Sequence, residues 1–125
     1  LTGVGEYLKA KNPQIRIVAV EPSDSPVLSE GKSGPHKLQG IGAGFVPEVL
    51  NTDIYDEIIQ IRSEEAYAAS KLLAKKEGVL VGISSGAALY AAFELARRPE
   101  NKGKTIVALL PDSGDRYYST PLFME

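Results

Sequence analysis

A segment rich in glycine and serine, residues 82–88, is the first part of this sequence whose residue types could carry chemistry. It joins an apolar run to a helical pattern, and in open α/β sheets ligands bind at the carboxyl ends of strands. The N-terminus of the following helix would add free N–H groups and a positive dipole end. The spacing leaves two interpretations open: Ser84 belongs to a ligand site, or it only caps the helix.

The same segment has the Gly-x-Ser-x-Gly spacing of a nucleophile elbow, formed by Gly82, Ser84 and Gly86. In a hydrolase of that kind an acidic residue and then a histidine follow the nucleophilic serine in the chain. The single histidine of this sequence, His36, precedes Ser84. The order of the residues therefore argues against a serine hydrolase.

A second candidate is the glycine-rich segment of residues 39–45, in which Gly40, Gly42 and Gly44 occupy three of five consecutive positions. Such a backbone can turn sharply and approach a ligand closely. The spacing is not that of a Walker loop, and the segment does not stand between a strand and a helix as a dinucleotide fingerprint does. Taken alone, the segment favours a structural turn.

A third candidate, residues 110–120, follows the last apolar run and contains Asp112 and Tyr117. Because it lies at the carboxyl end of an expected strand, its polar groups could line a site. A solvated turn explains the same residues and is favoured on this segment alone. A zinc site is excluded, because the sequence has one histidine and no cysteine.

The elements that must position these segments alternate between helix and strand. We expect helices over residues 4–11, 64–77 and 85–98, and strands over residues 15–20, 57–61, 79–83 and 105–110. Ser63 is the expected N-cap of the helix over residues 64–77, and Gly78 is expected to end that helix. Ser84 is the expected N-cap of the helix over residues 85–98. Residues 22–47, rich in proline and glycine, are expected to form a long loop. The alternation predicts an α/β fold with a mostly parallel sheet.

Composition narrows the class of protein. The length of 125 residues suits one domain, and the net charge of -2 gives no basic surface for nucleic acid or an anionic membrane. The absence of cysteine excludes disulfides and thiolate catalysis. No apolar stretch approaches the roughly 20 residues that span a bilayer.

The three candidate segments, in this order and at these separations, resemble the cysteine synthase (O-acetylserine sulfhydrylase) family. The matching stretches are residues 36–47 (HKLQGIGAGFVP), 82–87 (GISSGA) and 110–117 (LPDSGDRY). Residues 1–5 (LTGVG) also resemble the helix that follows the phosphate loop of that family. The resemblance extends over the whole chain, and the set of motifs is far more specific than any one of them.

This resemblance implies a fold type II enzyme that depends on pyridoxal 5′-phosphate, with the three-layer, tryptophan-synthase-β-like α/β fold. Residues 1–125 would be the C-terminal portion of that fold. The implied reaction is a β-replacement that converts O-acetylserine and sulfide into cysteine and acetate, with the cofactor supplying the difficult chemistry. The resemblance also implies a homodimer in the cytoplasm or an organellar stroma, and a serine acetyltransferase as a further partner.

Residue by residue, the resemblance makes Ser84 the donor of a hydrogen bond to the pyridine nitrogen of the cofactor. A neutral hydroxyl can donate there without protonating the ring, whereas a carboxylate would favour the protonated form. The implied cofactor-binding residues are Ser84, Gly40, Pro111 and Asp112, with Tyr117 near the same wall. The implied substrate site is Gly40, Ile41, Gly42 and Ala43, where a side chain on a glycine would crowd the substrate. The loop around His36 and Lys37 matches a rim that moves on closure.

Two parts of the family pattern do not occur in these residues: the Schiff-base lysine with its surrounding segment, and the glycine-threonine phosphate loop. We therefore expect no catalytic residue in this chain, and expect the isolated chain neither to bind pyridoxal phosphate tightly nor to make cysteine. We also expect it to expose a sheet edge and to be poorly folded or self-associating on its own. Two alternatives remain: a non-catalytic module that binds an acetyltransferase tail or a partner subunit, and a relative resembling cystathionine β-synthase.

Overall fold

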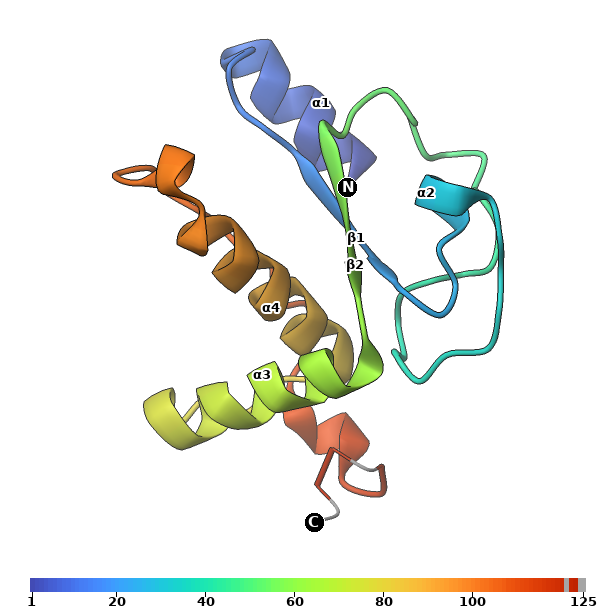
Figure 1. The fold of residues 1–125 in the computed structure, drawn as a ribbon, viewed down its shortest axis with the longest axis vertical. Helices are drawn as coiled ribbons and strands as arrows, with labels where there is room; N and C mark the ends of the chain where they lie inside the picture. Colours follow the sequence, from blue (N-terminus) through green and yellow to red (C-terminus); the bar gives the residue numbers. More distant parts are fainter. Residues whose placement is uncertain (121, 124–125) are drawn as a thin grey trace.

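Two parallel strands, β1 (Val18–Pro22) and β2 (Glu57–Ile61), form the sheet in the computed structural model, which describes residues 1–120, 122 and 123 (Figure 1). The helices are α1 (Thr2–Lys11), α2 (Val27–Glu30), α3 (Ser63–Glu77) and α4 (Ile83–Arg97), with 3-10 turns η1 (Pro99–Asn101) and η2 (Gly114–Tyr117). In Figure 1 the α3–α4 pair lies on one side of the strands and the loop that holds α2 on the other. The expected α/β class with a parallel sheet is confirmed.

Strand β2 covers the five expected residues, whereas β1 begins three residues later than expected and extends through Pro22. The late start is caused by Asp56, a residue distant in the sequence. The backbone N–H of Ile17 donates to the Asp56 carboxylate at 2.7 Å, and the Asp56 N–H donates to the Ile17 carbonyl, also at 2.7 Å. Ile17 is therefore bonded to a side chain where the ladder would begin. Pro22 is tolerated because it occupies the end of the strand, opposite Ile61.

Helix α3 begins one residue earlier than expected, because Arg62 and not Ser63 is its N-cap. The Glu65 carboxylate accepts the Arg62 N–H at 2.9 Å, which replaces the expected serine cap. Ser63 lies inside the helix and is buried. At the other end, the expected stop at Gly78 is confirmed: the residue adopts a left-handed φ of 69°, and its N–H bonds to the Ala74 carbonyl at 3.0 Å.

Helix α4 packs closely on α3 and forms the centre of the core. A Cβ on Gly86 would lie 2.1 Å from the Ala66 carbonyl oxygen, so only glycine permits this approach. The buried cluster around the contact is Leu38, Ile61, Ala66, Ile83, Ala87, Ala91, Tyr117 and Leu122. The core thus joins both helices to β2, to the glycine-rich loop and to the C-terminal segment.

Two expected strands, residues 79–83 and 105–110, are not strands in the described part of the chain. Val81 forms a single antiparallel bridge with Ser113, and α4 already begins at Ile83. In the second segment, exposure alternates: Val107 is 88% exposed and Leu109 75% exposed, while Ile106, Ala108 and Leu110 are half-buried. The alternation is that of a strand, but a strand also needs a neighbouring backbone, and no described segment pairs with residues 105–110.

The long expected loop, residues 22–47, contains the short helix α2 and is organised by a buried carboxylate. Glu21 is 4% exposed. Its two oxygens accept the N–H groups of Leu28 and Ser29 at 2.8 and 3.0 Å, and the Ser29 hydroxyl at 2.5 Å. An acidic group at the start of α2 satisfies donors that the short helix cannot satisfy itself.

Replacing Gly86 with alanine should destabilise the protein by at least about 1–3 kcal/mol, because the new methyl group would overlap a backbone carbonyl that cannot move aside cheaply. Gly3→Ala is the matched control: Gly3 is also helical, but a Cβ there meets no atom within 4 Å. The control should be neutral or stabilising by about 0.5–1 kcal/mol. Urea denaturation of a full-length enzyme that carries this segment, with each substitution in turn, measures the difference, and equal stabilities would contradict the packing.

Stability should also fall in acid, in part through Asp56. The hydrogen bond from Lys9 Nζ, 2.9 Å away, and the Ile17 N–H hold the pKa of Asp56 below its ordinary value of 3.8. A lowered pKa in the folded state contributes stability above the ordinary value, and this contribution is lost as the pH falls through the folded value. Asp56→Asn should therefore flatten the decline in unfolding free energy below about pH 4. Asp53→Asn, which alters an exposed carboxylate nearby, should leave the decline unchanged.

Candidate functional site

Ser84 lies in the first turn of α4, and its hydroxyl is free of partners in the described chain. The N-cap of the helix is Gly82, with no side-chain cap bond, so the expected role of Ser84 as a cap is wrong. The residue is 7% exposed, and no hydrogen bond joins its hydroxyl to another described group. A donor of this kind at a helix N-terminus is available to a ligand.

The glycine-rich loop approaches Ser84 at Gly40. A Cβ built on Gly40 would lie 3.3 Å from Ser84 Oγ and 3.6 Å from Ser84 Cβ. Gly40 also has a φ of 95°, a conformation that glycine adopts without strain. The loop therefore presents bare backbone to the Ser84 hydroxyl.

The three loop residues after Gly40 differ in how closely other residues pack against them. Gly42 has a φ of 67°, and a Cβ there would lie 2.6 Å from Pro22 Cγ and 2.7 Å from His36 Nε2. Packing of the loop on itself is thus enough to require glycine at this position. Ile41 packs against the core cluster, and Ala43 is exposed. Contact between substrate and Ile41, Gly42 or Ala43 stays a prediction.

His36 organises the glycine-rich loop, a role that its position in the sequence did not indicate. The Leu38 N–H donates to Nδ1 of the imidazole at 3.1 Å, so that nitrogen carries no proton. The other nitrogen, Nε2, then holds the proton and donates to the Gly42 carbonyl at 2.8 Å. The neutral ring bridges the two ends of residues 38–42. Its neighbour Lys37 is exposed, and its carbonyl accepts the Tyr67 hydroxyl at 3.2 Å.

Asp112 lies at the start of α4 but is bonded to Ser85, not to Ser84. The Ser85 hydroxyl donates to Asp112 Oδ1 at 3.0 Å, and the Tyr117 hydroxyl donates to Oδ2. The hydrogen bond to the Asp112 carboxylate, together with burial, raises the pKa of the Tyr117 phenol. Pro111 is exposed beside this group. Sequence reasoning missed Ser85, because nothing in the pair Ser84-Ser85 distinguishes a free hydroxyl from a bonded one.

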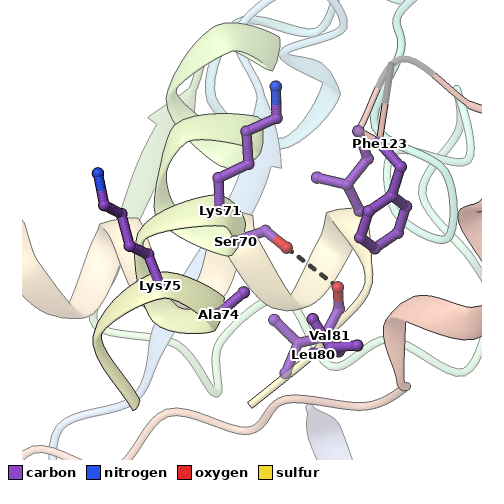
Figure 2. A pocket seen from close by; sticks show the side chains of 8 residues that line it. Ser70, Lys71, Ala74, Lys75, Leu80, Val81 and Phe123 are labelled. Atoms are coloured by element: carbon purple, nitrogen blue, oxygen red, sulfur yellow. Dashed lines mark hydrogen bonds between the residues drawn. The ribbon is translucent and has the colours of Figure 1, made fainter. Parts of the chain in front are cut away.

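The described residues also contain a pocket of about 480 Å³ (Figure 2), whose lining includes neither Ser84 nor Gly40. Its lining comes from α3, the segment before α4 and the C-terminal segment: Ser70, Lys71, Ala74, Lys75, Leu80, Val81, Leu122 and Phe123. The Ser70 hydroxyl donates to the Val81 carbonyl at 3.0 Å and joins two walls of the pocket. Within residues 1–120, 122 and 123, no group of three acidic, histidine or cysteine side chains could hold a metal ion.

The site has the properties that a cofactor with a neutral ring nitrogen requires. Ser84 offers one hydrogen-bond donor without a formal charge. Gly40 contributes backbone and no side chain beside the hydroxyl. The positive end of the α4 dipole disfavours a cation next to Ser84. The chemistry of the two residues is compatible with pyridoxal phosphate, and their contact with the cofactor stays a prediction.

Comparison with known proteins agrees with this chemistry. Residues 1–112 match the family model described as "Pyridoxal-phosphate dependent enzyme". The chain is 58% identical over 123 residues to cysteine synthase of Staphylococcus aureus, which is 98% of this chain and 39% of the relative. It therefore spans about two fifths of the length of the curated relatives that it matches. No helix in the described ranges has the length and apolar character needed to cross a membrane.

Solved structures of related enzymes superpose closely on this chain. Cysteine synthase (OASS) from Entamoeba histolytica gives a TM-score of 0.95 at 47% identity, covering 97% of this chain and 36% of that one. The O-acetylserine dependent cystathionine beta-synthase from Helicobacter pylori gives 0.87 at 41%, covering 98% and 39%. The partial fold type II arrangement expected from the sequence is thereby confirmed. From the match over residues 1–112 and these likenesses, the chain belongs to the family of pyridoxal-phosphate dependent enzymes.

Proposed function

We propose that this chain is the C-terminal portion of a cysteine synthase, in which Ser84 donates a hydrogen bond to the pyridine nitrogen of pyridoxal 5′-phosphate. The observation that carries the proposal is the free Ser84 hydroxyl, which lies across from the bare backbone of Gly40. Identity of 58% to curated cysteine synthases supports the reaction of O-acetylserine with sulfide to give cysteine and acetate.

When bound, pyridoxal phosphate supplies the electron sink for β-replacement. The contribution of this chain is to set the charge and the space around the ring. The Ser84 hydroxyl donates to the ring nitrogen without giving up its proton, and the α4 dipole opposes a positive charge there. Gly40 leaves room for the ring and the substrate. An uncharged ring nitrogen weakens the electron sink, which suits β-elimination without wider carbanion chemistry.

The base of the reaction and the phosphate-binding loop are proposed to lie outside these residues, in the part of the family fold that the match does not cover. None of the lysines here stands in a segment like that of the family's Schiff-base lysine. The chain therefore contributes binding and orientation, and no catalytic residue. The 41% identity to an O-acetylserine dependent cystathionine β-synthase keeps a relative with another sulfur nucleophile as the alternative.

The partners proposed for the complete enzyme are a second copy of the enzyme and the tail of a serine acetyltransferase. The tail would dock at the loop around His36 and Lys37. Beside that loop, Phe45 is 64% exposed and Val46 46% exposed, so apolar surface is available for a peptide to contact. This proposal is secondary to the enzymatic one, because it rests on the sequence resemblance and on the exposure of these side chains.

A chimera in which this chain replaces the matched 123 residues of the Staphylococcus aureus enzyme tests the proposed function. The chimera should form cysteine from O-acetylserine and sulfide, and the isolated chain should not. Ser84→Ala should lower cofactor affinity roughly 2- to 10-fold, the worth of one hydrogen bond. Ser84→Asp should reduce cysteine formation further, because a carboxylate favours the protonated ring nitrogen.

Ser119→Ala, at an exposed serine, is the control and should change neither cofactor affinity nor cysteine formation. A folded, cofactor-loaded chimera that makes no cysteine would overturn the assigned reaction. A chimera whose cofactor affinity and activity survive both Ser84 substitutions would overturn the role of Ser84. Tight, stoichiometric uptake of pyridoxal phosphate by the isolated chain would contradict the expectation that it lacks the essential binding groups.

Gly40→Ala in the same chimera should weaken cofactor binding, because the new methyl group would lie 3.3 Å from Ser84 Oγ. Gly44→Ala is a matched control. Both glycines have left-handed φ values, 95° and 87°, so both variants carry a backbone strain of about 1–2 kcal/mol. At Gly44 the nearest atom to a Cβ is Ser33 Cβ, 3.9 Å away. Cofactor titration should show a loss of affinity for Gly40→Ala and none for Gly44→Ala. Equal losses of affinity would mean that backbone strain explains the effect of both substitutions.

A further inference from the structure

The two serines at the start of α4 have opposite hydrogen-bonding states. Ser84 is 7% exposed and its hydroxyl has no partner among the described residues, whereas Ser85 is fully buried. The Ser85 hydroxyl donates to Asp112 Oδ1 at 3.0 Å, and it lies 3.4 Å from the Asp112 N–H, which donates to it. One of two neighbouring hydroxyls is therefore held by Asp112 while the other is left for a ligand.

Asp112 is itself fixed from several directions. The Tyr117 hydroxyl donates to its second carboxylate oxygen, and the Gly82 N–H donates to its backbone carbonyl at 3.2 Å. A Cβ on Gly82 would lie 2.2 Å from Asp112 Oδ1, so the carboxylate sits directly against the backbone of the N-cap residue. Tyr117 is 8% exposed and belongs to the core cluster. The carboxylate is thus tied both to the core and to the beginning of the helix.

We propose that Asp112 is a positioning residue, which holds the first turn of α4 through Ser85 and thereby keeps the Ser84 hydroxyl facing Gly40. The inference rests on the proposed function of Ser84. Consecutive side chains of a helix point about 100° apart, so fixing the direction of Ser85 also fixes that of Ser84. Hydrogen bonds to an ionised carboxylate are roughly twice as strong as neutral ones, which suits a group that holds a helix turn in place.

This role differs from the direct cofactor contact that the sequence resemblance implies for Asp112. Each carboxylate oxygen already accepts a hydroxyl, from Ser85 and from Tyr117. The charge lies at the positive end of the α4 dipole, where it also stabilises the helix start. Asp112 would affect the cofactor only through the orientation of Ser84, and its effect should vanish when the Ser84 hydroxyl is removed.

The first test needs no cofactor. The chimera without pyridoxal phosphate is titrated by tyrosinate absorbance, and the difference between Tyr117 and Tyr117→Phe proteins isolates the Tyr117 phenol. Because the Asp112 hydrogen bond is the leading cause of its raised pKa, Asp112→Asn should shift this titration to lower pH. An unshifted titration would mean that the carboxylate does not hold Tyr117, and would overturn the proposed arrangement whether or not the enzyme makes cysteine.

The second test is a double-mutant cycle on cofactor affinity. Asp112→Asn is introduced into two backgrounds: the chimera that keeps Ser84, and the chimera that carries Ser84→Ala. Asp112→Asn should weaken affinity roughly 3- to 10-fold in the first background and leave it unchanged in the second. Ser85→Ala, measured in the same two backgrounds, should change cofactor affinity in the same way as Asp112→Asn. It replaces Asp112→Asn if that variant does not fold. Equal losses in both backgrounds, or no loss in either, would overturn the positioning role.

The outcomes separate this inference from the proposed function. If Ser84→Ala alone leaves cofactor affinity unchanged, the role of Ser84 is wrong and the positioning role fails with it, even when the Tyr117 titration shifts. If Ser84→Ala weakens affinity and the cycle is additive, the function stands and only the inference fails. A shifted titration together with a non-additive cycle supports both.

Discussion

The close contact of α4 on α3 at Gly86 is the constraint on which the rest of the structure depends. Because a Cβ there would lie 2.1 Å from the Ala66 carbonyl oxygen, the two helices meet at a distance that only glycine allows. The contact places the start of α4 over the core cluster, which includes Leu38 of the glycine-rich loop and Tyr117 of the C-terminal segment. Three segments distant in the sequence are thereby brought to one helix N-terminus, and this convergence creates the candidate site.

The start of α4 and the glycine-rich loop are held by hydrogen bonds of different kinds and different strengths. The start of α4 is tied to Asp112 by a buried hydroxyl and backbone contacts. The glycine-rich loop is held by a neutral histidine ring that bridges Leu38 and Gly42. A charge-assisted bond is stronger than a bond to a neutral ring, so the helix side is the more rigid support. The helix side of the site is therefore held by stronger hydrogen bonds than the loop side that carries Gly40.

Much of the fold was predictable because its signals are local. Strand β2 and the stop of α3 at Gly78 depend on residue types within a few positions, and both agree with expectation. The misses depend on distant groups. Strand β1 starts late because Asp56 binds Ile17, and residues 105–110 are not a strand because no described backbone pairs with them. At the site, the resemblance assigned both Gly40 and Ser84 to the cofactor, but the contact between them and the different partners of Ser84 and Ser85 appeared only in the structure.

Two neighbouring serines can be told apart only after the chain has folded, and this limits what a motif alone can assign. Both hydroxyls lie in the first turn of α4, and either could bond a ligand on the evidence of spacing. The choice is made by Asp112, which lies 27 residues away from Ser85 in the sequence and occupies its hydroxyl. The Ser85 hydroxyl is already bonded and gains little from a ligand, whereas the Ser84 hydroxyl, whose oxygen keeps contact with solvent, can exchange water for a ligand and gain about 0.5–1.5 kcal/mol. The assignment of Ser84 to the cofactor therefore depends on the partner of its neighbour as much as on Ser84 itself.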